Sequence, residues 1–221
     1  MLVPLIAATL LAAAPTTPLE VVKAGNADVQ KAANASGATV EQLATVVEKF
    51  VDFEELAKRA LGKSWDPLTP AQRKDFTETM KGVLRASYAQ KAIGQANANV
   101  TYGKEAIKGD EATVNTTIKV KSDQIPVDYK LYKSKSGWRI YDIVTDEVSL
   151  VETYAGQFRK LIADKGFDGL LSTLKAKRAQ LEKSAATTKA SDVGSSSATS
   201  TGATDVKAPA NGDSKAPAGK K

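Results

Sequence analysis

The chain has 221 residues, and its 31 Lys and Arg side chains outnumber its 25 Asp and Glu side chains, giving a formal net charge of +6 at pH 7. It contains no Cys and no His. A chain without these residues has no Ser-His-Asp triad, no Cys-His pair, no disulfide and no zinc site of nitrogen and sulfur ligands. We therefore expect a binding protein and not an enzyme, with no cofactor and no metal.

The charged side chains of both signs are interspersed along residues 20–183. Nucleic-acid binders concentrate basic residues on one face, often with aromatic residues between them. The sequence has no such cluster, so we expect no nucleic-acid partner.

Residues 1–14 are almost entirely apolar. The run is shorter than the ~20 residues that span a bilayer, and it has the length of the apolar part of a secretion signal. Ala12 to Ala14 supply a small-x-small cleavage site. We interpret residues 1–14 as a signal peptide, with a buried first helix as the alternative. Export of a chain without Cys favours a bacterial periplasm.

Residues 184–221 consist mainly of Ala, Ser, Thr, Gly, Pro and Lys, and their only larger apolar residues are Val193 and Val206. Such a segment buries too little apolar surface to offset its chain entropy, so we predict a disordered tail. Residues 19–183 remain as one domain, long enough for a single core. We expect this domain to be a monomer.

Two capping patterns predict helix starts in the first third of the chain. Thr39 with Gln42 forms a capping box before a stripe of apolar residues with helical spacing. Asp52 with Glu55 forms a second capping box, and Gly62 ends the short helix that follows.

Two further helices flank these. Apolar residues with helical spacing over 19–29 predict a first helix, weakened by Gly25 and Asn26. Thr69, followed by Pro70 at the first helical position, opens a helix that we expect to run to about Ile93.

After residue 94 the apolar period changes from helical spacing to two. Residues 112–120, 127–132 and 138–144 alternate between apolar and polar side chains, with turn residues at 108–110 and 134–137. Sequential hairpins predict an antiparallel sheet with one face turned to the core.

Helical spacing returns over residues 151–166 and 170–181. The predicted fold class is therefore α+β, with helices packed on one face of a curved antiparallel sheet.

Asp142 is the candidate for catalysis, because it lies inside an apolar strand between Tyr141 and Ile143. A buried carboxylate there could act as a base, or it could hydrogen-bond the backbone or an Arg at a sheet edge. The sequence shows no second catalytic group, so we favour the structural role.

Three groups of motifs, in order and spacing, resemble the MlaC family of periplasmic phospholipid-binding proteins, also called toluene-tolerance or ABC-transporter auxiliary proteins. The resemblance covers about residues 40–180. The motifs are VDFEELAKRALGKSW at 51–65 with LTPAQ at 68–72, IPVDYKL at 125–131 with GWRIYDI at 137–143, and VSLV at 148–151 with GFDGL at 166–170. The chain departs from the family at Glu147, where Gly is usual, and at Ala155, where Arg is often found.

The resemblance implies a cone similar to nuclear transport factors, with the acyl chains of a lipid in a cavity between sheet and helices. It implies a shuttle between an outer-membrane lipoprotein complex and an inner-membrane ABC transporter with an MCE-type subunit, serving outer-membrane lipid asymmetry. The alternatives are a ligand-free interaction subunit of such a transporter or, on weaker grounds, an enzyme of this fold that uses Asp142.

A phospholipid carrier must offer its ligand a large apolar lining. Burial contributes about 0.8 kcal/mol per CH₂, or roughly 20 kcal/mol for two long acyl chains. The expected lining residues are the large apolar side chains on sheet and helix faces, although the same side chains could form a closed core. They are Leu56, Leu61, Leu84, Tyr88, Val127, Tyr129, Leu131, Ile140, Ile143, Val148, Leu150, Tyr154 and Phe158.

Overall fold

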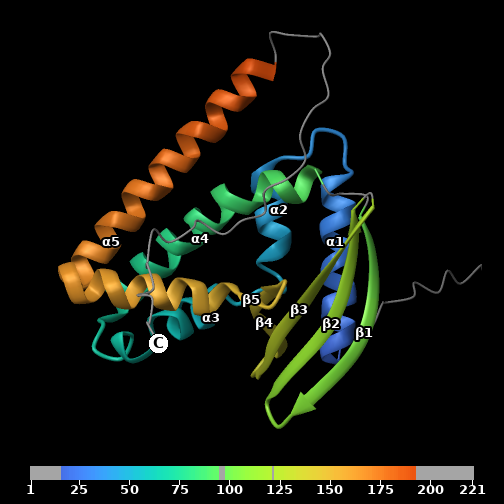
Figure 1. The fold of residues 1–221 in the computed structure, drawn as a ribbon, viewed down its shortest axis with the longest axis horizontal. Helices are drawn as coiled ribbons and strands as arrows, with labels where there is room; N and C mark the ends of the chain where they lie inside the picture. Colours follow the sequence, from blue (N-terminus) through green and yellow to red (C-terminus); the bar gives the residue numbers. More distant parts are fainter. Residues whose placement is uncertain (1–15, 95–97, 121, 193–221) are drawn as a thin grey trace, which may run out of the picture.

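The structure is a computed structural model that describes residues 16–94, 98–120 and 122–192. The predicted signal peptide and residues 193–221 of the predicted tail lie outside the described residues. Helices precede and follow a sheet, as Figure 1 shows. The elements are α1 (Pro18–Ala33), α2 (Val40–Val47), α3 (Phe53–Leu61), the 3-10 turn η1 (Gly62–Ser64), α4 (Pro70–Gly94), β1 (Asn99–Lys108), β2 (Glu111–Val120), β3 (Asp123–Ser134), β4 (Gly137–Thr145), β5 (Val148–Ser149) and α5 (Leu150–Asp192).

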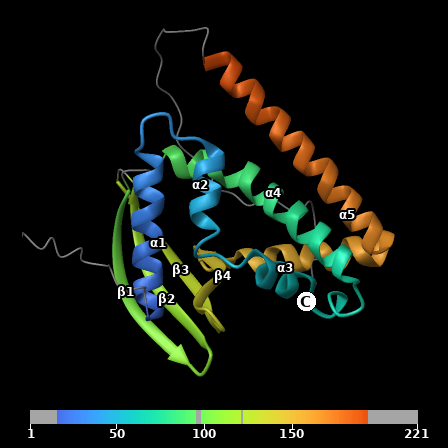
Figure 2. The ribbon, with the colours of Figure 1, turned by 180° about the vertical axis from the view of Figure 1, so that it is seen from behind.

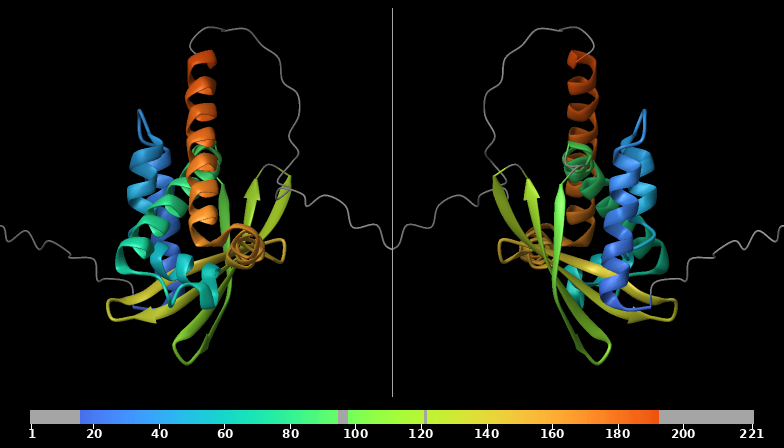
Figure 3. Two further views of the ribbon diagram at one scale, coloured as in Figure 1. Left: turned by 90° about the vertical axis from the view of Figure 1, so that its left-hand side faces the viewer. Right: turned by 90° about the vertical axis from the view of Figure 1, so that its right-hand side faces the viewer.

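The five strands form one antiparallel sheet in the order β1-β2-β3-β4-β5. The predicted hairpin turns are confirmed, with Gly109 (φ +62°) between β1 and β2 and Gly137 (φ +106°) at the start of β4. A register shift between Lys130 and Leu131 bends β3 against β4. Helices α1, α2 and α4 lie on the same side of the curved sheet, as the side views show (Figure 3). The α+β prediction is confirmed.

Two strands were not predicted from the sequence. Strand β5 has two residues, too few to show a period. Strand β1 is the edge of the sheet and is mostly exposed, and its register shifts between Tyr102 and Glu105. An exposed, bulged edge strand does not need alternating apolar residues, so its sequence carries little signal.

The helix caps follow the sequence with one correction. Thr39 and Gln42 form the predicted capping box, and Asp52 Oδ1 accepts from the backbone N–H of Glu54 (3.1 Å) and of Glu55 (3.0 Å). The expected return bond from Glu55 to the backbone N–H of Asp52 was wrong. That N–H donates instead to the carbonyl oxygen of Ile140 in β4 (2.8 Å), which leaves the Glu55 carboxylate to pair with α3 side chains.

Buried apolar side chains form two clusters. The helical cluster joins α3, α4 and α5, and its rings include Phe76 and Phe158, whose centroids lie 5.5 Å apart in an edge-to-face pair. The sheet cluster joins Val21 and Val22 of α1 to the inner face of β2, β3 and β4. Gly25, which the sequence predicts to weaken this helix, lies in the interior of α1. A Cβ added at Gly25 would come within 3.2 Å of the Phe50 ring.

Helix α5 changes direction at Gly166, whose φ of 68° and ψ of −177° are not helical. The break confirms the predicted end of a helix near this residue. The second segment continues to Asp192, past residue 184, where the sequence predicts the tail to begin. Among the residues that the structure describes, no helix has the length and apolarity needed to cross a membrane.

Candidate functional site

The thirteen expected lining residues fall into three sets. Leu56, Leu61, Leu84, Tyr154 and Phe158 are buried in the helical cluster, with Leu150 partly buried against it. Val127, Tyr129, Leu131 and Ile140 are buried in the sheet cluster, with Ile143 partly buried against it. Tyr88 is 48% exposed and Val148 is 52% exposed. The structure therefore divides the expected residues between two apolar surfaces instead of gathering them around one point.

Val51, in the linker between α2 and α3, packs against both clusters. It forms a parallel bridge with Ile140 of β4. Two backbone hydrogen bonds hold this bridge, from Asp52 N–H to the Ile140 carbonyl oxygen (2.8 Å) and from Ile140 N–H to the Phe50 carbonyl oxygen (2.9 Å). The two clusters meet at Val51, and we call the boundary between them the apolar seam.

Each cluster contains a buried tyrosine. Burial raises the pKa of Tyr154 to about 12, with a smaller electrostatic contribution from Tyr88 of α4. Burial also raises the pKa of Tyr129 to about 12, while its hydroxyl donates to Asn26 Oδ1 of α1 (3.2 Å). A tyrosine offers an apolar ring and a polar tip, a combination that suits the margin of a site for an amphiphile.

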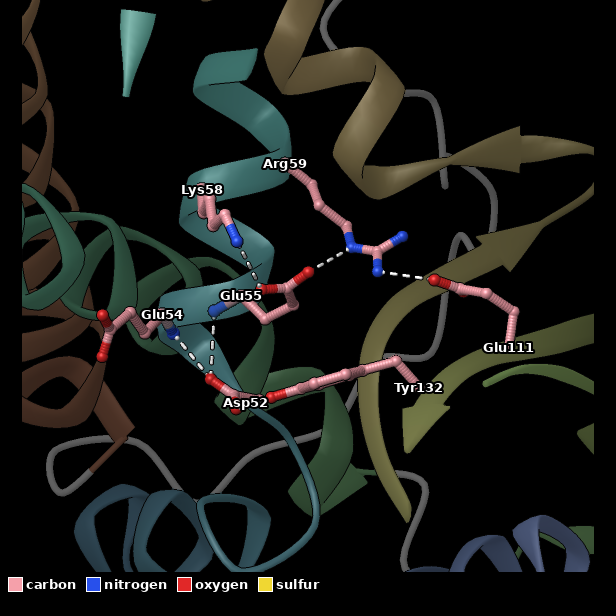
Figure 4. Close-up of polar contacts among 7 residues, drawn as sticks. All are labelled: Asp52, Glu54, Glu55, Lys58, Arg59, Glu111 and Tyr132. Atoms are coloured by element: carbon pink, nitrogen blue, oxygen red, sulfur yellow. Dashed lines mark hydrogen bonds and ion pairs between the residues drawn. The ribbon is translucent and has the colours of Figure 1, made fainter. Parts of the chain in front are cut away.

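A polar network ties α3 to the sheet (Figure 4). The Tyr132 hydroxyl donates to Asp52 Oδ2 (2.5 Å). The other carboxylate oxygen, Oδ1, caps α3. Burial and this hydrogen bond raise the pKa of Tyr132. Arg59 joins Glu55 of its own helix to Glu111 of β2, with both N–O distances 2.7 Å.

The guanidinium of Arg59 also lies 3.7 Å from the ring centroid of Tyr141. The network holds α3, and with it Leu56 and Leu61, in a fixed place against the sheet. The sequence does not predict this network. The charged start of α3 is visible in the sequence, but its partners lie on strands far along the chain.

The candidate base Asp142 is 2% exposed and fully engaged. Its Oδ2 accepts from the Ser149 hydroxyl (2.6 Å) and its Oδ1 from the Val151 backbone N–H (3.0 Å). The Lys130 ammonium lies 3.5 Å from Oδ2. Asp142 therefore caps the start of α5 and neutralises Lys130, which is the structural role favoured from the sequence.

Two open hollows, of about 600 and 440 Å³, lie on either side of Asp52. Neither is lined by any of the thirteen expected residues. The charged groups of the larger hollow are largely engaged with protein: Lys81 pairs with Glu48 (2.9 Å), and Arg139 donates to three backbone carbonyl groups. Within the described residues, no group of three or more acidic side chains is placed to hold a metal ion. These hollows are polar surface and do not suit acyl chains.

Comparison with known proteins identifies the family. The family model of the MlaC protein matches residues 18–176, most of the described chain. The chain belongs to the MlaC family. The resemblance found in the sequence is thereby confirmed.

One curated relative is the intermembrane phospholipid transport system binding protein MlaC of Haemophilus influenzae. It is 23% identical over 137 residues, which are 59% of this chain and 64% of that protein, so the match spans less than two thirds of the relative. A solved structure of a phospholipid-binding protein from Ralstonia solanacearum, in complex with a phospholipid, matches with a TM-score of 0.68 and 27% identity. That match covers 73% of this chain and 97% of the Ralstonia chain.

Glu147, where the sequence predicts a departure from the family, lies in a turn with left-handed backbone. Asp146 (φ 48°) and Glu147 (φ 65°) form the two-residue turn between β4 and β5, and both adopt left-handed backbone. Glycine is favoured at such positions because a Cβ strains them. Both positions of this turn carry acidic residues, so the sheet-to-α5 junction carries backbone strain. Ala155, the other departure, follows Tyr154 on α5 and is half-buried.

Proposed function

We propose that this chain binds a phospholipid, with the acyl chains between the helical cluster and the sheet cluster. The observation that carries the proposal is the match to the Ralstonia phospholipid complex, which spans nearly all of that chain. A likeness over the whole fold makes a phospholipid the first ligand to expect for this chain.

The apolar seam supports the same location. The two clusters meet at Val51, where the side chain packs against both and the backbone pairs with Ile140 of β4. Half-buried Ile118, Ile125 and Ile143 flank the sheet cluster. When acyl chains enter between the clusters, the apolar side chains replace contacts with each other by contacts with lipid. Little apolar surface is therefore exposed to water with or without the lipid.

Membership of the MlaC family supports a transport role. We propose that the chain carries phospholipid through the periplasm between an outer-membrane lipoprotein complex and an inner-membrane MCE-type ABC transporter. Such a carrier holds its ligand by burial alone and needs no cofactor, no metal and no acid or base.

A second candidate is a ligand-free interaction subunit of the transporter. It is favoured by the burial of Leu131, Phe158 and their neighbours in closed clusters, and by the polar lining of the two hollows.

A transfer assay distinguishes the two candidates. Donor vesicles carry fluorescent phosphatidylethanolamine with a quencher, and acceptor vesicles carry neither. The carrier accelerates transfer in proportion to its concentration, whereas an interaction subunit without a lipid site leaves the rate at that of vesicles alone, which would overturn the proposal.

A further inference from the structure

The second segment of α5 starts beside α4 and runs in the same direction, and the two helices diverge toward their C-terminal ends (Figures 1 and 2). We call residues 175–192 of α5 the arm. Lys175 Nζ pairs with Asp75 Oδ2 of α4 (2.7 Å), and Arg85 Nη2 of α4 lies 3.8 Å from Glu182 Oε1 of the arm. The MlaC family model ends at residue 176, so nearly all of the arm lies beyond the segment that the family accounts for.

Between these ion pairs, Arg178 of the arm lies across Gly82 of α4. A Cβ added at Gly82 would lie 2.4 Å from Arg178 Nε and 2.6 Å from its Cδ, so the outer part of the Arg178 side chain would have to move away from α4. Glycine inside a helix is less stable than Ala. The glycine in the middle of α4 therefore makes room for the Arg178 side chain.

Glu182 completes this contact. Its Oε1 accepts from Arg178 Nε (2.8 Å) and also faces Arg85, so one carboxylate stands between a guanidinium of each helix. These side chains are partly exposed, and each ion pair alone contributes little. The close approach at Gly82 adds the packing that exposed ion pairs lack.

The contact bears on the C-terminal half of α4, which carries two of the expected lining residues. Leu84 is buried in the helical cluster, and Tyr88, one turn later, is 48% exposed. The C-terminal half of α4 therefore contacts the arm on one side and packs in the helical cluster on another. Movement of this half of α4 away from the cluster must break the arm contact.

We propose that Arg178 and Gly82 form a positioning contact through which the arm restrains α4 and slows the release of bound phospholipid. The proposal rests on the proposed function. Arg178 does not touch the lipid; it acts through α4.

Gly82→Ala in the full chain tests the contact, with Gly156→Ala in α5 as the matched control. Both changes replace a helical glycine, but a Cβ at Gly156 meets no atom within 4 Å. Hydrogen exchange of the arm amides and release of fluorescent phosphatidylethanolamine to acceptor vesicles are measured for each. Gly82→Ala should increase the rates of arm hydrogen exchange and of lipid release by about threefold to tenfold, which corresponds to the loss of roughly 1 kcal/mol of contact energy. Gly156→Ala should change neither rate.

Arg178 supplies the second arm of the test. Arg178→Ala should also speed release, and adding Gly82→Ala to it should have little further effect, because the obstructing side chain is gone. Arg178→Lys, with a cation but no planar guanidinium, should fall between wild type and Arg178→Ala. Faster arm exchange with unchanged lipid release would overturn the proposal, as would equal arm exchange in Gly82→Ala and Gly156→Ala. Absence of lipid from the wild type would overturn the proposed function, while the hydrogen exchange would still report on the arm contact.

Discussion

Tyr132 of β3 donates a hydrogen bond to Asp52, the residue that caps α3, across 2.5 Å. Tyr132 directly follows Leu131 of the sheet cluster, and α3 carries Leu56 and Leu61 of the helical cluster. One carboxylate therefore links the backbones that present the two apolar surfaces, close to the Val51 bridge.

The Tyr132 hydroxyl should contribute measurably to stability. Tyr132→Phe removes a hydrogen bond to a charged acceptor, and we expect the free energy of unfolding to fall by about 1–2 kcal/mol in urea denaturation. Tyr102→Phe is the control, because the Tyr102 hydroxyl makes only a long contact of 3.4 Å to Asn26. Equal stability of the two variants would show that the Asp52 bond does not hold α3 to the sheet.

The buried tyrosines predict loss of stability at high pH. Burial raises the pKa of Tyr129, Tyr141 and Tyr154 to about 12, above the value of about 10 in an unfolded chain. Between pH 10 and 12 the unfolded chain releases protons that the folded chain retains, so the free energy of unfolding falls as pH rises. The contribution is complete below pH 10.

Thermal melts from pH 8 to 12 measure this decline. Tyr129→Phe should lower the melting temperature at pH 8, because Asn26 loses its donor, but it should also flatten the decline above pH 10. A variant curve parallel to that of the wild type over the whole range would contradict the assignment of Tyr129.

The turn between β4 and β5 predicts a stabilising change. Glu147→Gly removes a Cβ from left-handed backbone that costs roughly 1 kcal/mol, partly offset by the greater freedom of Gly in the unfolded chain. We expect a gain of up to about 1 kcal/mol, with no gain for Glu147→Ala, which keeps the Cβ. A gain of the same size in both variants would attribute the effect to removal of the Glu charge and not to strain.

How far the sequence predicts this fold depends on whether a local pattern exists. Thr39 with Gln42 and Thr69 with Pro70 define helix starts within four residues, and both predictions are confirmed. Strand β1 was missed because an exposed edge lacks alternation. The contact of Arg178 with Gly82 joins residues far apart in the chain, and nothing local in either segment indicates the other.

The candidate site shows the same limit. Apolar periodicity indicates which side chains turn inward, such as Leu131 and Phe158, but it does not distinguish a closed core from the wall of a lipid site. That distinction depends on whether the helical and sheet clusters separate along the seam, which is a property of their packing. The assignment of the thirteen residues to the lipid remains a prediction.

A pair of substitutions on the sheet separates core from lipid wall. Leu131 is fully buried, and Leu131→Asp should unfold the domain because an unpaired carboxylate has no access to water there. Ile143 is only partly buried on the same face, so Ile143→Asp should leave the fold intact and reduce phospholipid transfer severalfold. Circular dichroism melts and the vesicle transfer assay check both. Normal transfer by a folded Ile143→Asp variant would remove this face from the site.

Native mass spectrometry of the full chain purified from a bacterial periplasm tests lipid binding most directly. The predicted spectrum shows the chain with the added mass of one diacyl phospholipid, which dissociates on activation to leave the free chain and an identifiable lipid. A spectrum of the free chain alone, unchanged after incubation with phospholipid vesicles, would contradict the proposed function.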